Sequence, residues 1–164
     1  LVLRFEEVFL FGLGAAIVIP TFTRYTQRAQ TTEVSVKLEQ IFMAAQIYYA
    51  TPQRSSSGEA ESPGLPPSTG PTPAEVPCGE SVHTSSSIWE DNPTWSALGF
   101  GLSEAQRYSY QFDVAGPADA LTVRISAFGD LDCDGTHSTF VRTGTIRNGV
   151  LDYLGDIYIE NEFE

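Results

Sequence analysis

The stretch FGLGAAIVIPTFTRYTQRAQ, from Phe11 to Gln30, joins an apolar run to a polar helical pattern through Pro20. The apolar run Val8–Ile19 has twelve residues, whereas a helix that crosses a bilayer needs about 20. A buried core helix is one interpretation of such a run. However, Gly12, Gly14 and Pro20 each weaken an isolated helix, so we expect support from outside the monomer.

After the proline the hydrophobic pattern becomes regular. Apolar residues recur at steps of three and four, and polar residues such as Lys37 and Gln40 fall between them. The apolar stripe consists of Val34, Leu38, Ile41, Ala45 and Tyr48, widened by Phe42 and Tyr49. This spacing predicts an amphipathic helix over residues 31–50 that packs on a sheet, and Pro52 disfavours its continuation.

Residues 51–77 are rich in Pro, Ser, Gly and Thr and contain few residues that form a core. Such a composition buries too little apolar surface to offset the entropy of ordering. We therefore expect a surface loop between the helix and the sheet. Ser and Thr beside Pro also suit O-glycosylation in an exported protein.

The period changes to two in the remainder of the chain. Apolar and polar residues alternate in Tyr108–Phe112 and Leu121–Ser126, and two further apolar segments are Thr139–Ile146 and Val150–Ile159. Glycine-containing turns near 116 and at Asn148-Gly149 separate them. The pattern predicts an α+β fold in which a long N-terminal helix packs on an antiparallel sheet of about four strands, with the β head over residues 78–164.

The first fifty residues resemble the N-terminal helix of type IV pilins and type II secretion pseudopilins. The order of small, aliphatic and aromatic residues around an Ile-Pro pair carries this resemblance, together with the continuation TEVSVKLEQIFMAAQIYYA. The matching positions are Gly12, Ala15, Ala16, Ile17, Ile19, Pro20, Phe22 and Tyr25. The resemblance implies a pilin-like fold in which residues 1–30 are the apolar assembly half of the helix and residues 31–50 pack on the head. In a filament, copies of such a helix exclude water, and Gly12, Gly14, Ala15 and Ala16 allow close approach.

The extreme N-terminus departs from the family. A glutamate near the mature N-terminus of relatives pairs with a terminal amine of a neighbouring subunit, and Leu3 occupies its position here. Arg4, Glu6 and Glu7 lie nearby and are candidates for a substitute charge network. An unusual processing site or a sequence error are the alternatives, and the acidic flank is not typical of a signal peptide.

The resemblance implies a structural subunit of an extracellular filament on the cell surface, held in the inner membrane before assembly. Its expected partners are copies of itself and a pilus assembly machinery, and adhesion, motility, DNA uptake and electron transfer are all roles of such filaments. Two alternatives stay open. One is the major pseudopilin of a type II secretion system, and the other is a monomeric, membrane-anchored binding module.

Charge and motifs disfavour other classes of protein. The formal net charge is −12, and residues 55–164 carry seventeen acidic and four basic side chains, a balance that repels a phosphate backbone. Motifs typical of hydrolases, zinc proteases and nucleotide-binding enzymes are absent from the sequence. We therefore expect neither nucleic-acid binding nor catalysis, and we expect His83 and His137 at the surface.

The chain has two cysteines, Cys78 and Cys133. An even number in an exported protein favours one disulfide, which would stabilise the fold by roughly 4 kcal/mol. A zinc site that adds His83 and His137 lacks the usual ligand spacing.

The segment GDLDCDGTHSTF, Gly129–Phe140, places Asp130, Asp132 and Asp134 at alternate positions before a glycine. This pattern matches the front of an EF-hand-like calcium loop, and it also resembles a segment of some pilin heads. Val141 stands where the loop would carry its closing glutamate. The sequence predicts weak calcium binding, with Kd of about 10⁻⁴–10⁻³ M, or alternatively a plain acidic turn.

Overall fold

The computed structural model describes residues 31–52, 64–117 and 120–162. Its N-terminal helix covers residues 31–50, and six strands and two short helices follow. In chain order these elements are β1 (Thr69–Thr72), α2 (Ser87–Glu90), α3 (Pro93–Leu98), β2 (Tyr108–Ala115), β3 (Thr122–Gly129), β4 (Ser138–Arg147), β5 (Val150–Tyr153) and β6 (Tyr158–Glu160). The chain is therefore α+β, as predicted, and the compact unit from Val34 onward contains the whole described core.

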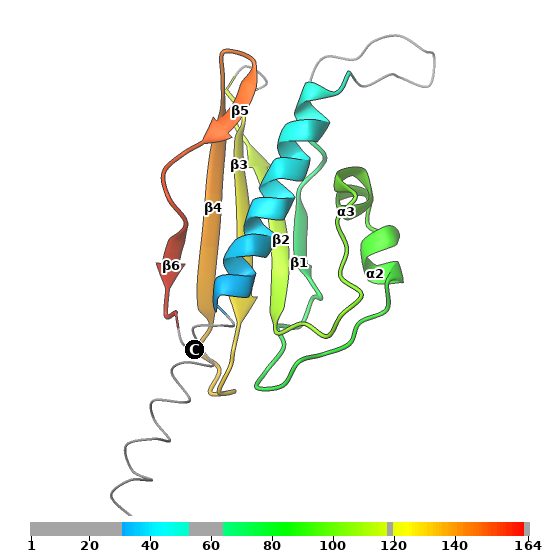
Figure 1. Ribbon diagram of the computed structural model, residues 1–164, viewed down its shortest axis with the longest axis vertical. Helices are drawn as coiled ribbons and strands as arrows, with labels where there is room; N and C mark the ends of the chain where they lie inside the picture. The colour runs from blue at the N-terminus through cyan, green and yellow to red at the C-terminus, as the bar shows by residue number, and fades with distance from the viewer. Residues whose placement is uncertain (1–30, 53–63, 118–119, 163–164) are drawn as a thin grey trace, which may run out of the picture. The chain divides into compact units, whose positions relative to one another are not determined.

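The six strands form one antiparallel sheet in the order β1-β2-β3-β4-β5, and β6 also pairs with β4. Because β4 is ten residues long, β5 pairs with its last residues and β6 with its first. The two short strands thus share one edge of the sheet, while β1 forms the opposite edge (Figure 1).

The two faces of the sheet differ in polarity. Alternate residues of β2, β3 and β4 point to the face that carries the N-terminal helix, and they include Phe112, Ile125 and Phe140, each with an exposed fraction of 0%. Residues of the opposite face include Gln111, Arg124 and Thr143. One face therefore packs on the core, and the other carries mainly polar residues, although Ser109, Ser126 and Val141 are buried on it (Figure 1).

The β4–β5 hairpin is a two-residue turn at Asn148 and Gly149. Their φ angles are +52° and +76°, as a type I′ turn requires. The turn predicted near residue 116 also falls between two strands, β2 and β3, and Gly116 has φ of +100°. Both predicted hairpin positions are confirmed.

The helices α2 and α3 belong to an excursion between β1 and β2. Asn92 caps α3, because its side-chain oxygen accepts hydrogen bonds from the backbone N–H groups of Thr94 and Trp95. Trp95 Nε1 donates to Thr72 Oγ1 at 2.8 Å, and Asn92 Nδ2 donates to Thr69 Oγ1 at 2.7 Å. These bonds hold α3 beside β1.

The strand count differs from the prediction, since the sheet has six strands rather than about four. The apolar segment Val150–Ile159 forms two strands, because the chain turns at Gly155 with φ of +78°. The other additional strand, β1, lies within the proline-rich stretch that we expected to be a loop. Its sequence TGPT has no alternation, and its pairing with β2 is irregular.

Candidate functional site

The N-terminal helix presents two different faces. The side chains of Val34, Leu38, Ile41, Phe42 and Ala45 are buried with exposed fractions of 0–1%. On the outer face, Val36, Met43 and Ile47 have exposed fractions of 50%, 53% and 66%. The predicted apolar stripe is therefore confirmed as the core-facing side, and a second, narrower row of apolar residues remains uncovered in the monomer.

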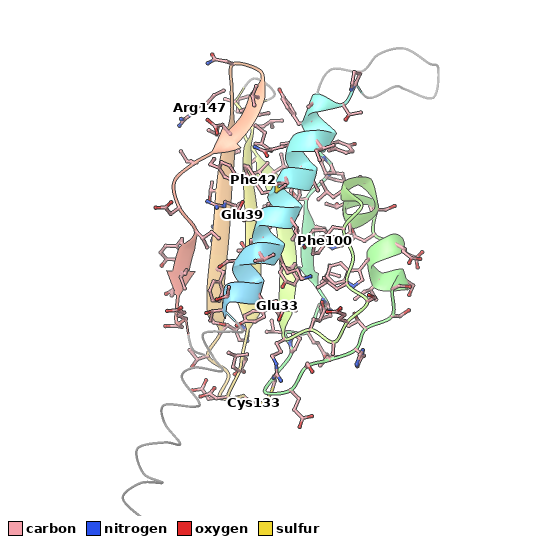
Figure 2. All side chains as sticks on the ribbon, viewed as in Figure 1. Glu33, Glu39, Phe42, Phe100, Cys133 and Arg147 are labelled. Carbon is pink, nitrogen blue, oxygen red and sulfur yellow. A yellow bond between two sulfur atoms is a disulfide. The ribbon has the colours of Figure 1, made fainter. Side chains whose placement is uncertain are left out.

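Polar and aromatic contacts fix the helix on the sheet. The Phe42 ring stacks on Tyr153 with ring centroids 4.4 Å apart, and Gln46 Nε2 donates to the Leu151 carbonyl at 2.9 Å. Glu39 forms an ion pair with Arg142, whose guanidinium also lies 4.7 Å from the centre of the Tyr153 ring. Figure 2 shows Glu39 and Phe42 on the side of the helix that lies over β4. These contacts fix the helix in one register against β4 and β5.

All of the predicted assembly-helix and charge-network residues lie outside the described part of the chain. They are Gly12, Gly14, Ala15, Ala16, Ile17, Ile19, Pro20, Phe22 and Tyr25, together with Arg4, Glu6 and Glu7 of the predicted charge network. The prediction for these residues stays a prediction. Among the described helices, none is long and apolar enough to cross a membrane.

The two cysteines form a disulfide, as predicted. Cys78 and Cys133 have Cα atoms 4.8 Å apart, and the bridge joins residues separated by 55 positions. It connects the segment after β1 to the turn between β3 and β4, where Figure 2 labels Cys133. The Gly79 N–H donates to the Asp130 carbonyl at 2.7 Å beside it, so the turn is held by a covalent and a backbone link.

The same turn brings the three predicted aspartates together. Asp130, Asp132 and Asp134 each offer a carboxylate oxygen within 4.8 Å of the others. Asp130 is buried, with an exposed fraction of 5%, whereas Asp132 and Asp134 are exposed. Oxygen donors at this spacing suit a hard cation such as calcium.

Backbone N–H groups also donate hydrogen bonds to these carboxylates. The two Asp130 oxygens accept from the N–H groups of Asp134 and Gly135 at 3.2 and 3.1 Å. Asp134 accepts from the Thr136 N–H at 2.6 Å, and hydrogen bonds from Thr136 lower the pKa of the Asp134 carboxyl. The loop is thus folded by its own hydrogen bonds, and calcium binding stays a prediction.

The residue at the closing position of a full calcium loop, Val141, belongs to a strand and not to the loop. Val141 lies in β4, is buried, and pairs with Tyr158 of β6. Its side chain is apolar, so the loop offers half of the ligand set of an EF-hand. His83 and His137 are both exposed. Because Cys78 and Cys133 form the disulfide, neither cysteine has a free thiol to bind zinc together with these histidines.

A feature that the sequence analysis missed is a cluster of aromatic rings around α2 and α3. Trp89 contacts Trp95 and Phe100 edge-on, with both pairs of ring centroids 5.6 Å apart. Figure 2 shows Phe100 beside the two short helices. The signal in the sequence is that both tryptophans of the chain lie within the stretch Trp89–Trp95, and they follow no helical or strand period.

Comparisons of the chain with family models, with curated proteins and with solved structures gave no match. The resemblance to pilins therefore depends on the residues of the N-terminal helix. The described residues of the head show an α+β architecture, one disulfide and an acidic turn.

Proposed function

We propose that the chain is a structural subunit of an extracellular filament of the type IV pilus kind. In this proposal the subunit is anchored in the inner membrane before assembly, and a pilus assembly machinery adds it to copies of itself. The N-terminal helix polymerises, and the acidic β head lies on the outside of the filament.

The observation that carries the proposal is the division of the helix into two faces. One face packs on the sheet of the head, where Leu38, Ile41 and Phe42 are completely buried. The other face keeps Val36, Met43 and Ile47 in water, although exposed apolar rows cost free energy in a monomer. An assembly of parallel helices would cover this row, and it would also support the glycine-containing run upstream of it.

The head supports the same function in two ways. A disulfide is typical of exported proteins, because the cytosol keeps thiols reduced. The acidic side chains of residues 55–164 keep a densely repeated surface soluble, since like charges oppose aggregation between filaments.

The test is whether the full-length chain sediments as long filaments, seen by electron microscopy, when it is produced with an assembly machinery. Ile47→Glu places a charge in the exposed apolar row and is expected to reduce filament yield strongly. Ser81→Glu is the matched control, because Ser81 is exposed in the loop before α2, away from the helix, and receives the same negative charge. Neither change should lower the melting temperature of the head.

The possible outcomes separate the alternatives. Long fibres that contain the chain along their length support the proposal. Short assemblies that appear only with active protein secretion favour a pseudopilin. A chain that stays monomeric in detergent and in the membrane, with Ile47→Glu and wild type alike, contradicts both.

A further inference from the structure

The edge of the sheet that β5 and β6 share is continuous. β5 pairs with the end of β4, and β6 pairs with its start. Between the two strands, the Leu154 N–H donates to the Thr143 carbonyl at 2.9 Å. Arg142 Nη1 also donates to the Gly155 carbonyl at 3.1 Å. Residues 150–160 therefore lie along β4 as one edge (Figure 1).

Large apolar side chains on this edge remain in water. Leu154, Tyr158 and Ile159 have exposed fractions of 45%, 58% and 43%. A single exposed apolar residue is ordinary, but aromatic and aliphatic side chains that gather on one short segment are typical of protein interfaces. We call residues 152–160 the edge strip.

The edge strip is also acidic. Asp152, Asp156 and Glu160 are exposed along it, and the last seventeen residues of the chain contain no Lys, Arg or His. Within the part of the chain that the structure describes, the Asp156 side chain has neither an ion pair nor a hydrogen bond. The negative charge of the strip is therefore available to a partner.

The carboxylates exclude several kinds of partner. Two copies that joined through their edge strips would bring like charges together, and charged residues on an edge strand commonly prevent such edge-to-edge pairing. Anionic lipids and nucleic acids are repelled by the same carboxylates. The edge strip therefore fits a surface that combines cations with apolar or aromatic groups.

The sequence of the chain itself contains such a surface. The segment TRYTQRAQ, residues 23–30, lies outside the described residues and ends directly before the N-terminal helix. It contains Arg24, Tyr25 and Arg28 and no acidic residue. In the helix expected there, these three side chains share one face, since residues three and four apart are neighbours. Cations and an aromatic ring thus complement the carboxylates and apolar side chains of the edge strip.

We propose that the edge strip of one copy binds the basic segment 23–30 of a neighbouring copy. Arg28 forms an ion pair with Asp156, and Tyr25 packs on the exposed apolar side chains of the strip. The inference rests on the proposed function, because parallel helices displaced along a filament bring the basic segment of one copy level with the head of another. The contact joins two different surfaces, so it repeats along the filament without closing.

Charge reversal tests the pairing. The full-length chain is produced with an assembly machinery, and filament yield is measured by sedimentation and electron microscopy. Arg28→Glu and Asp156→Arg should each lower the yield about tenfold, because each places like charges in contact. The double variant restores opposite charges and should recover most of the yield. Arg124→Glu and Glu104→Arg are the matched controls, since they make the same charge changes at exposed positions outside the strip. They should leave the yield unchanged.

A cross-link identifies the occupant of the strip. A chain with Arg28→Cys and a chain with Asp156→Cys are produced together with wild type, and a short bismaleimide joins the introduced thiols in the filaments. Each variant carries one introduced thiol, so a linked peptide pair of positions 28 and 156, found by mass spectrometry, requires two copies. Glu104→Cys in place of Asp156→Cys is the control and should give no such pair.

The outcomes separate this inference from the proposed function. Wild-type filaments without the 28–156 pair, or with a yield that neither charge reversal lowers, overturn the inference and leave the filament proposal intact. A double variant that assembles no better than either single variant also overturns it. A pair that forms only within one chain carrying both thiols shows that the segment binds its own head, which overturns the contact between copies. A wild-type chain that forms no filaments overturns the proposed function and this inference together.

Discussion

Replacing Phe42 by alanine should cost the head a large part of its stability. Phe42 has an exposed fraction of 0% and stacks on Tyr153 across the junction of helix and sheet. Phe→Ala substitutions in cores cost about 3–5 kcal/mol, and a stacked pair adds about 0.5–1.5 kcal/mol beyond its buried area. We therefore expect a loss of about 5 kcal/mol from a domain whose total stability is of order 5–15 kcal/mol.

The assay is the unfolding in urea of a fragment that begins at Ala29, monitored by circular dichroism. Met43→Ala is the control, because Met43 is the next residue of the same helix and points outward with an exposed fraction of 53%. It should change the free energy of unfolding by less than about 0.5 kcal/mol. Equal effects of the two substitutions would refute the packing of the helix on the sheet.

A second substitution tests the contact from the sheet side. A Cβ at Gly144 of β4 would collide with the Phe42 ring and lie 2.9 Å from the Asp152 carbonyl oxygen. Gly144→Ala alone should therefore destabilise by about 1–3 kcal/mol. In the Phe42→Ala background its cost should fall, because the ring is gone while the Asp152 carbonyl remains. An additive double mutant would show that the two residues do not touch.

Four further predictions concern the rest of the chain. Deletion of Leu1–Arg28 should leave a soluble, folded head, since every described core residue lies at 34 or later, and aggregation of that fragment would contradict the two-part architecture. Cys133→Ser should lower the free energy of unfolding by about 2–5 kcal/mol, because it removes the disulfide. An intact-mass measurement that finds two free thiols in the exported protein would contradict the disulfide. Millimolar calcium should raise the melting temperature of the head more than magnesium at matched ionic strength, and Asp132→Asn should abolish that difference; equal effects of both ions on wild type would leave a plain acidic turn. The Asp134 carboxyl should titrate below its usual value of 3.8, because hydrogen bonds from Thr136 stabilise the ionised form. Its contribution to stability is present above that pH and is lost as the pH falls through the lowered pKa, and a carbon-detected titration with a midpoint at or above 3.8 would contradict the loop geometry.

The helix and the central strands were predictable because their apolar residues repeat with a regular period. The stripe from Val34 to Ala45 follows the 3.6-residue period, and the large apolar residues of β2 and β3 recur at every second position. The disulfide followed from the cysteine count, and the aspartate cluster followed from spacing within one turn. Apart from the cysteine count, these signals are local in sequence.

The missed elements depend on contacts between distant residues. The β1 segment is short and contains Gly70 and Pro71, and hydrogen bonds from Asn92 and Trp95 hold it in place. A cavity lies between α2 and Leu102, where Asn92 caps the start of α3 and Gly99 ends α3 in the left-handed conformation. No periodic pattern encodes this arrangement, so its signal in the sequence is limited to two tryptophans that lie close together in the chain.

The excursion between β1 and β2 has its two ends tied together. Val82 and Gln106 exchange both backbone hydrogen bonds at 2.8 and 3.0 Å, and Arg107 Nη1 donates to the Gly79 carbonyl at 2.6 Å. A loop with joined ends can change length at little entropic cost to the rest of the fold. The segment from 83 to 105 can therefore vary in its exposed parts, provided that Trp89, Trp95 and Leu98 remain to fill the core. The surface of the head can thus change around this loop while the sheet and the helix on it keep their packing.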